Sequence, residues 1–270
     1  MQKLPPGLSL LKVLLFITSL LAGASGAASA AQGQYQLGVG VLAGAQPHYP
    51  GAAQSAHFVL PVPYFSYRSA QLQIDRQGAT GLLAQGDHWA LNLSLAGAFA
   101  VDNDKNQLRQ GMPALDWIAE IGPALDVQLT PNLQLRLPVR AAFATDFQQA
   151  SGIGWRFEPQ LRYQQKMAAG FTWESVLSLA ASSKAYHQYL YGVAPEYQQI
   201  QRPTYSATAG FSGWRFANGV SLQQGHWWFA LYSRYDYLHD ATFANSPLYA
   251  KTHQLSAGIV VVKILKTGAW

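Results

Sequence analysis

Five residues in the last fifth of the sequence have the side chains that a hydrolase would need. His226, Asp236, His239 and Asp240 flank one predicted strand, and Ser246 follows in the next segment. Serine, histidine and an acid form a nucleophilic set only when they converge within hydrogen-bonding distance. A strand of about a dozen residues, rising ~3.3 Å each, would hold His226 far from His239 and Asp240. We therefore assign no catalytic residue to this chain.

The other groups that could do chemistry show no functional spacing. The five remaining histidines lack the spacing of metal ligands, no glycine-rich loop joins a strand to a helix, and no carboxylate pair stands out. The sequence contains no cysteine, which excludes a disulfide framework and a lipid-attachment thiol. We predict a non-enzymatic protein without cofactor or metal, and we expect these histidines in loops. They are His48, His57, His88, His187 and His253.

Alternating apolar and polar residues run along most of the chain, which is typical of two-faced strands. In the sharpest case Trp155, Phe157 and Leu161 alternate with Arg156 and Arg162. We predict roughly 12 strands, an even number as in single-chain bacterial barrels. They are Gln34–Leu42, Tyr64–Ile74, Ala79–Ala84, Trp89–Val101, Leu115–Leu129, Leu133–Phe143, Ile153–Gln164, Phe171–Ser182, Tyr205–Phe211, Trp214–Gln223, Trp227–Leu238 and Gln254–Leu265.

The composition favours a strand protein whose outer face contacts lipid. Charged residues make up 11% of the sequence, against ~25% in soluble domains. A soluble β-sandwich is the alternative, but it would carry more surface charge. Six tryptophans near predicted strand ends fit the aromatic girdle of a membrane barrel. They are Trp117, Trp155, Trp173, Trp214, Trp227 and Trp228. We predict an all-β, transmembrane, antiparallel up-and-down β-barrel, because closure pairs every backbone amide in a solvent without water.

The polar residues of the predicted strands fall on one parity and include both acids and bases. We expect the face that they form to line the lumen. Two interpretations stay open: a structural network of ion pairs across a narrow barrel, or a small polar channel. The acids are Asp116, Glu120, Asp126, Glu158, Glu174 and Asp236, and the bases are Arg136, Arg140, Arg156, Arg162 and Arg234.

The N-terminus has the features of a secretion signal. Lys3 and Lys12 accompany an apolar stretch at Val13–Leu21, and Ala28-Ser29-Ala30 has the small-x-small form of a cleavage site. A retained membrane helix is the alternative, but this stretch is too short. We expect residues 1–30 to be removed, leaving 31–270 as the barrel. Of 18 basic residues 18 − 2 = 16 then remain against 13 acids, a net charge of +3, which argues against a nucleic-acid partner.

Short and long connections alternate along the predicted strands. Thr130–Asn132, Met167–Gly170 and Gln223–Gly225 are short. The longer ones are polar and span residues 102–113, 184–202 and 239–253. Barrels of the outer membrane have short periplasmic turns and longer extracellular loops. We therefore expect the long set outside the cell and both chain termini on the periplasmic side.

Several short motifs are spread over nearly the whole mature chain. They are Gly38-Val39-Gly40, Tyr49-Pro50-Gly51, Pro61-Val62-Pro63-Tyr64 with Tyr67, Arg109-Gln110-Gly111-Met112-Pro113, Glu120-Ile121-Gly122-Pro123, and Tyr237-Leu238 with Asn245-Ser246-Pro247-Leu248. In this order they resemble the MipA/OmpV family of Gram-negative outer-membrane proteins. One departure is the end of the last strand, where Leu265 is followed by Lys266-Thr267-Gly268-Ala269-Trp270.

The resemblance implies a location in the outer membrane, in contact with its lipids, and a non-enzymatic scaffold of the cell envelope. Family members are named for interaction with a murein-degrading lytic transglycosylase, and their proposed role joins it to a penicillin-binding murein synthase. The resemblance carries over no catalytic residue. A narrow channel or small-molecule transporter is the alternative function, and an outer-membrane lipid or peptide hydrolase comes third.

Overall fold

The computed structural model describes residues 33–69, 72–75, 78–102 and 105–269. The predicted signal peptide and Trp270 lie outside these residues. Thirteen strands are present: β1 (Gln34–Pro47), β2 (Ser55–Arg68), β3 (Leu72–Asp75), β4 (Gly78–Gln85), β5 (Trp89–Ala98), β6 (Trp117–Thr130), β7 (Leu133–Thr145), β8 (Ala150–Phe157), β9 (Gln160–Lys166), β10 (Phe171–Ser182), β11 (Gly210–Gln224), β12 (Trp227–Tyr237) and β13 (His253–Ala269).

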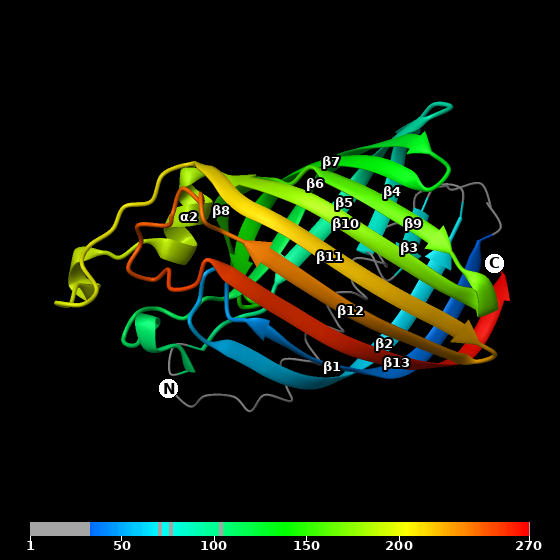
Figure 1. Ribbon diagram of the computed structural model, residues 1–270, viewed down its shortest axis with the longest axis horizontal. Coiled ribbons are helices and arrows are strands. Elements are labelled where there is room, and N and C mark those ends of the chain that lie inside the picture. Colours follow the sequence, from blue (N-terminus) through cyan, green and yellow to red (C-terminus); the bar gives the residue numbers. More distant parts are fainter. Residues whose placement is uncertain (1–32, 70–71, 76–77, 103–104, 270) are drawn as a thin grey trace.

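All strands pair antiparallel, and the sheet closes on itself (Figure 1). The closure runs through β1, which pairs with both β2 and β13. Strands β8 and β9 both pair with β7 and β10. They are two pieces of one barrel strand, interrupted at Pro159, which has no N–H to donate to a ladder. Thirteen strands minus one gives the barrel 12, which confirms the predicted architecture.

The two faces of the wall match the predicted parity. Outward apolar side chains such as Val39, Leu231 and Ile259 are 50–60% exposed, as a surface in contact with lipid requires. Inward charges on the same sheet, such as Glu120 and Arg140, are buried. Of the six tryptophans predicted for the girdle, Trp155, Trp214 and Trp227 are exposed near strand ends. Trp228 was assigned wrongly, because it points inward and stacks on Tyr64 with 6.1 Å between ring centroids.

The long connections gather over one end of the barrel, seen on the left of Figure 1. They include the 3-10 turn η2 (Gln107–Arg109), the helix α2 (Lys184–Tyr191) and the turn η4 (Pro195–Tyr197). We call these connections, residues 48–54, 99–116, 183–209 and 238–252, the cap. The other end, which carries the short turns and the C-terminal end of β13, is the turn end. No helix among the described residues is long and apolar enough to cross a membrane.

Three predicted strand segments differ from the structure. Tyr205–Phe211 is cap for most of its length, and β11 begins only at Gly210. Tyr64–Ile74 contains the end of β2 and the whole of β3. The last strand runs beyond Leu265 to Ala269, because a bulge opposite Leu37 and Gly38 absorbs one residue and lets pairing with β1 continue.

Candidate functional site

The charged side of the lumen is organised around Glu158, which lies between β8 and β9. Its side chain is 5% exposed. Oε2 accepts hydrogen bonds from Arg140 at 3.0 Å and from Arg156 at 3.3 Å, and Oε1 accepts one from Arg215 at 2.8 Å. One carboxylate therefore joins β7, β8 and β11. Arg215 was missed by the sequence analysis, although its place between the outward Trp214 and Phe216 gives it inward parity.

The network continues on both sides of this carboxylate. Arg215 also donates to Asp236 at 2.8 Å, and Asp236 accepts from Arg234 at 3.0 Å. On the other side Arg140 donates to Glu120 at 3.0 Å. The buried charges are thus paired and hydrogen-bonded, the condition under which the cost of burial is offset. Of the two open interpretations, the ion-pair network is the one this arrangement fits.

Two smaller ion pairs lie nearer the turn end. Asp126 accepts from Asn92 at 2.7 Å and lies 3.7 Å from Arg136. Arg162 donates to Glu174 at 2.8 Å. Among the acids predicted for the lumen, Asp116 differs: it precedes β6 at the cap, and it is exposed. Partial desolvation by the surrounding cap, and to a lesser extent the neighbouring Asp146, raise the pKa of Asp116 above 3.8.

A cavity of about 180 Å³ lies between the network and the cap. Network side chains supply most of its charged lining, together with Asp116. Its apolar lining combines Leu190 of α2 with residues of β6 and the cap such as Leu115 and Ile118, and the small residues Ala96, Gly97 and Ala98 border it on β5. The network holds four arginines (Arg140, Arg156, Arg215, Arg234) and three carboxylates (Glu120, Glu158, Asp236), so its formal charge is 4 − 3 = +1.

Two arginines hold the cap segments together. Arg109, 3% exposed, donates to the carbonyls of Leu190 and Pro113. Arg202 donates to the carbonyls of Leu108 and Gln110, both at 2.9 Å. A guanidinium presents several donors in fixed directions, so one side chain can satisfy loop carbonyls that have no strand partner.

An aromatic cluster fills the centre of the cap. The rings of Tyr191 and Phe243 stack with centroids 3.7 Å apart, and Tyr49 meets Tyr191 edge-on at 5.9 Å. The Tyr49 hydroxyl donates to the Leu248 carbonyl at 2.8 Å. Burial raises the pKa of Tyr49 to about 12, against the opposing effect of Arg109. The motifs around Tyr49, Arg109 and Ser246, which carry the family resemblance, therefore converge in the cap.

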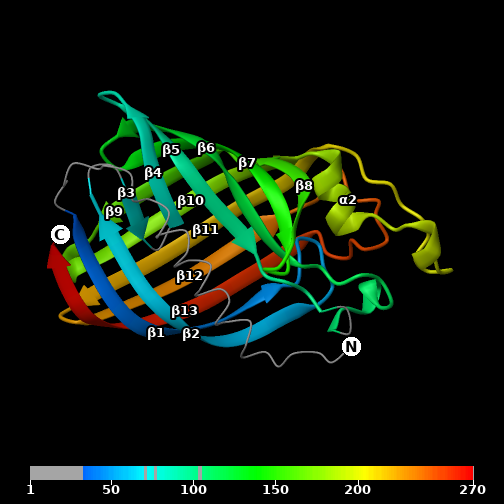
Figure 2. The ribbon, with the colours of Figure 1, turned by 180° about the vertical axis from the view of Figure 1, so that it is seen from behind.

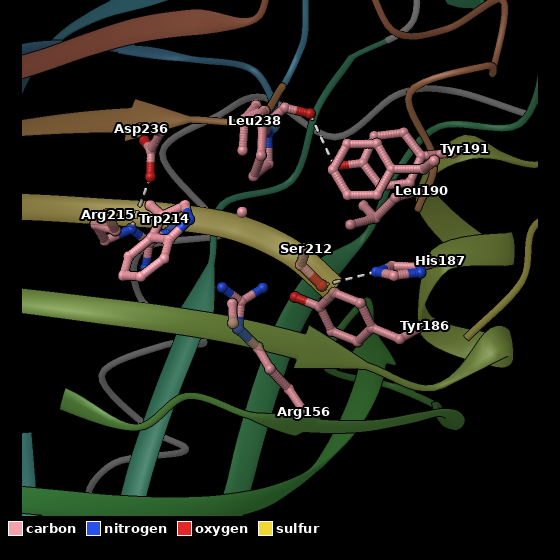
Figure 3. A pocket seen from close by; sticks show the side chains of 14 residues that line it. Arg156, Tyr186, His187, Leu190, Tyr191, Ser212, Trp214, Arg215, Asp236 and Leu238 are labelled. Atoms are coloured by element: carbon pink, nitrogen blue, oxygen red, sulfur yellow. Dashed lines mark hydrogen bonds and ion pairs between the residues drawn. The ribbon is translucent and has the colours of Figure 1, made fainter. Parts of the chain in front are cut away.

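The structure places a serine beside His187, for which the sequence predicted only a position in a loop. His187 of α2 lies with Nε2 2.8 Å from Ser212 Oγ (Figure 3). Its Nδ1 lies 2.8 Å from the Thr208 carbonyl. A carbonyl only accepts, so Nδ1 carries the proton and Ser212 donates to Nε2. Ser212 is the extra residue of a β-bulge in β11 opposite Ala180 and Ala181, and this bulge with the positive φ at Gly213 turns Ser212 toward the histidine.

This pair has little room for a substrate. His187 is 1% exposed and Ser212 is 7% exposed. The adjoining cavity of about 20 Å³ has space for about one water molecule. In this conformation the pair ties α2 to β11. Burial lowers the pKa of His187 below 6.5, and the hydrogen bond to Thr208 only partly opposes this effect.

The five residues considered for hydrolysis do not converge. His226 lies in the β11–β12 turn, at the turn end. His239 and Asp240 lie beyond β12 at the opposite end, exposed, with 3.0 Å between them. Ser246 donates to the Tyr191 carbonyl inside the cap, and Asp236 belongs to the lumen network. Nor do the described residues bring three His, Asp or Glu side chains into a metal-binding group.

The family model for MltA-interacting protein MipA matches residues 39–264 of this chain. The chain belongs to the MipA family. The match spans all barrel strands in part or whole, together with every cap segment. Membership and the lipid-facing wall make this an outer-membrane β-barrel protein. No curated protein matches this chain.

Several solved barrels are similar in arrangement but distant in sequence. The NanC porin is 11% identical with a TM-score of 0.41, covering 84% of this chain and 100% of its own. The translocator domain of autotransporter NalP from Neisseria meningitidis is 8% identical with a TM-score of 0.41, covering 96% and 97%. The CymD monoaromatic hydrocarbon channel is 10% identical with a TM-score of 0.38, covering 87% and 89%.

Proposed function

We propose that this protein is a non-enzymatic interaction protein of the cell envelope. In this proposal it binds a lytic transglycosylase and a penicillin-binding murein synthase at the periplasmic face. The family description, MltA-interacting protein, supports the first partner. The proposal includes export by a signal peptide cleaved after Ala30. It also places the turn end in the periplasm, because short turns face that side in outer-membrane barrels.

The main support for the proposal is that ion pairs cross-link the inner wall of the barrel and that the cap covers one end of the lumen. Six ion pairs join its inner wall, and the packed cap lies over one end. An aqueous pore needs a continuous wet path, whereas a cross-linked interior keeps the wall in one shape. A rigid barrel anchored in lipid suits a protein whose role is to hold others in place.

The described side chains at the turn end give the partner surface its chemistry. Arg68, Lys166 and Lys266 are exposed there, and Asp87 is the acid among the described turns. The excess of positive charge favours an acidic patch on the partner. Because short turns offer limited area, we expect a transient contact guided by charge rather than a large apolar interface.

The test is crosslinking in the periplasm of intact cells, with murein hydrolases and synthases identified by mass spectrometry. Wild-type protein should capture a murein enzyme. The triple variant R68E/K166E/K266E should lose this capture, because each substitution reverses a charge at the contact. Lys251→Glu reverses an exposed charge on the cap and should leave capture unchanged.

Two results would count against the scaffold. One is wild-type protein that captures no murein enzyme, and the other is a cap variant that loses capture as completely as the triple variant. Heat-dependent mobility in detergent gels should be the same for all three proteins, so that loss of folding is separated from loss of binding.

A narrow channel is the second candidate, favoured by the cavity of about 180 Å³ and by the formal charge of +1 on the adjoining network. Such a pore would prefer anions. Planar-bilayer recordings distinguish the two functions: the scaffold predicts no stepwise current, and the channel predicts anion currents that fall when Arg215 is replaced by glutamine.

A further inference from the structure

One long edge of the barrel wall has no backbone partner among the described residues. β2 has 14 residues, all paired with β1, and only Tyr67 and Arg68 pair with β3 on the other side. The remaining 14 − 2 = 12, residues 55–66, form what we call the free edge. At ~3.3 Å per residue it is about 40 Å long, against a lipid-facing band of ~25 Å.

Across from the free edge, β5 also lacks a strand partner on that side among the described residues. β4 pairs with β5 only as far as Ser94, so within the described chain Leu95–Ala98 pairs only with β6. Near the cap, the rings of Phe58 and Phe99 connect the two sides with centroids 6.0 Å apart. In Figure 2 the far wall, including β10 and β11, is visible between β2 and β5.

The sequence of β2 suits an edge that stays unpaired. Pro61 and Pro63 are two residues apart, so their backbone nitrogens point to the same side of the strand. The ladder to β1 continues through both positions without a register shift. We place them on the free edge, where proline is tolerated in sheets. There they remove two donors that would otherwise lack partners in lipid.

The inner face beside the free edge is apolar. Tyr64, Trp228, Val262 and Ile264 form one buried cluster, with Val260 packed against it. Leu60 and Val62 share the inward parity of Tyr64 and continue this surface along β2 toward the cap. We call it the apolar wall. β12 contributes to both parts of the lumen: Trp228 of the apolar wall lies near the turn end, and Arg234 and Asp236 of the network lie nearer the cap. The inner wall therefore has an apolar region beside β2 and a charged region at the network.

We infer that the free edge of β2 is a lateral entry from the bilayer to the apolar wall, which binds an aliphatic chain. The edge lies at membrane depth, and β2 presents apolar side chains on both faces: Val59 outward at 72% exposure, Leu60 and Val62 inward. A chain moving from lipid to the lumen would stay on apolar surface throughout. This site is independent of the proposed murein partners and compatible with a lumen closed to ions.

The test uses purified protein in vesicles with two photoactivatable probes. One is a fatty acid with a diazirine near the chain end, and the other is a phospholipid with the same chain. Labelled residues are identified by mass spectrometry. We expect label at inward Leu60 and Val62 as well as at outward Val59. Label from the phospholipid identifies membrane lipid as the occupant, and label from the fatty acid alone identifies a free amphiphile.

A variant pair gives the matched control. L60N/V62N should reduce inward labelling about tenfold, equivalent to about 1.4 kcal/mol, and leave labelling of Val59 unchanged. Ala217→Asn places the same amide inward on the fully paired β11 and should have no effect. Label confined to outward residues of the wild type overturns the inference, and so does equal loss in both variants. The wild-type map decides the matter even when L60N/V62N does not fold.

Discussion

Removing the charge of Glu158 should cost more stability than removing any other single carboxylate of the lumen. Glu158→Gln keeps the shape of the side chain but leaves Arg140, Arg156 and Arg215 without their shared anion. The network then holds four arginines and two carboxylates, so its formal charge rises from +1 to 4 − 2 = +2. Breaking a buried ion pair from one side costs about 3–5 kcal/mol, and we expect a loss in this range.

Glu174→Gln is the matched control. Glu174 is also an inward acid paired with an arginine, but its side chain is 25% exposed, against 5% for Glu158. Water screens that pair with Arg162, so the same substitution should cost about 1 kcal/mol or less. The assay is urea unfolding in lipid vesicles, followed by tryptophan fluorescence, with the midpoint converted to free energy at an unchanged slope.

A double variant tests the cause of the expected loss. Arg156 pairs with Glu158 at 3.3 Å, and its guanidinium lies 5.7 Å from the ring of Tyr186. Arg156→Gln in the Glu158→Gln background removes one uncompensated cation and should recover part of the lost stability, which a double-mutant cycle measures. Equal losses in Glu158→Gln and Glu174→Gln, or no recovery in the double variant, would refute the reasoning from burial and charge.

Three further predictions concern the cap. Phe243→Ala removes a ring that is 1% exposed and stacked on Tyr191; it should destabilise the cap by about 3–5 kcal/mol, seen as faster protease cleavage in residues 239–252. Arg109→Lys cannot donate to Leu190 and Pro113 in the same fork, so hydrogen exchange in α2 should speed up while strand protection is unchanged. Burial lowers the pKa of His187 below 6.5. Below pH 6.5, His187 therefore binds a proton in the unfolded cap more readily than in the native cap. Cap stability should therefore fall as pH drops below 6.5 and level off beneath the lowered pKa. His187→Gln should reduce this dependence in hydrogen exchange between about pH 7.5 and about pH 5, and His48, whose pKa burial also lowers, accounts for the part that is left.

The alternation of apolar and polar residues was sufficient to predict most barrel strands and most of the charged side chains that face the lumen. A strand with lipid on one face and paired charges on the other has a strong period of two, as in Ile153–Gln164. Arg156 and Arg162 therefore pointed inward as predicted. Arg215 could have been found by the same rule, because Trp214 and Phe216 on either side of it are outward residues.

The cap could not be predicted from periodicity, because its order comes from tertiary contacts. α2 has only eight residues, a length that is marginal for an isolated helix. Ser183 caps its N-terminus by accepting from the Tyr186 amide, and this Ser is the one local signal in the sequence. The burial of His187 depends on Ser212 and Thr208, which are 25 and 21 residues away along the chain.

Residues 55–63 of β2 were not predicted as a strand, and the reason differs from that for the cap. In this segment Phe58, Val59, Leu60 and Val62 are apolar on both parities, so no alternation marks a strand there. A barrel strand loses its period of two only where the inner face, like the outer one, avoids water. Leaving Phe58, Leu60 and Val62 against a wet lumen would forgo about 1.5–3 kcal/mol for each side chain that could be fully buried. An aliphatic chain on the apolar wall would recover part of this free energy, whereas the charged network would still require its ion pairs. The failure of the sequence pattern in β2 and the proposed lateral site therefore have one physical origin, the apolar inner face beside β2.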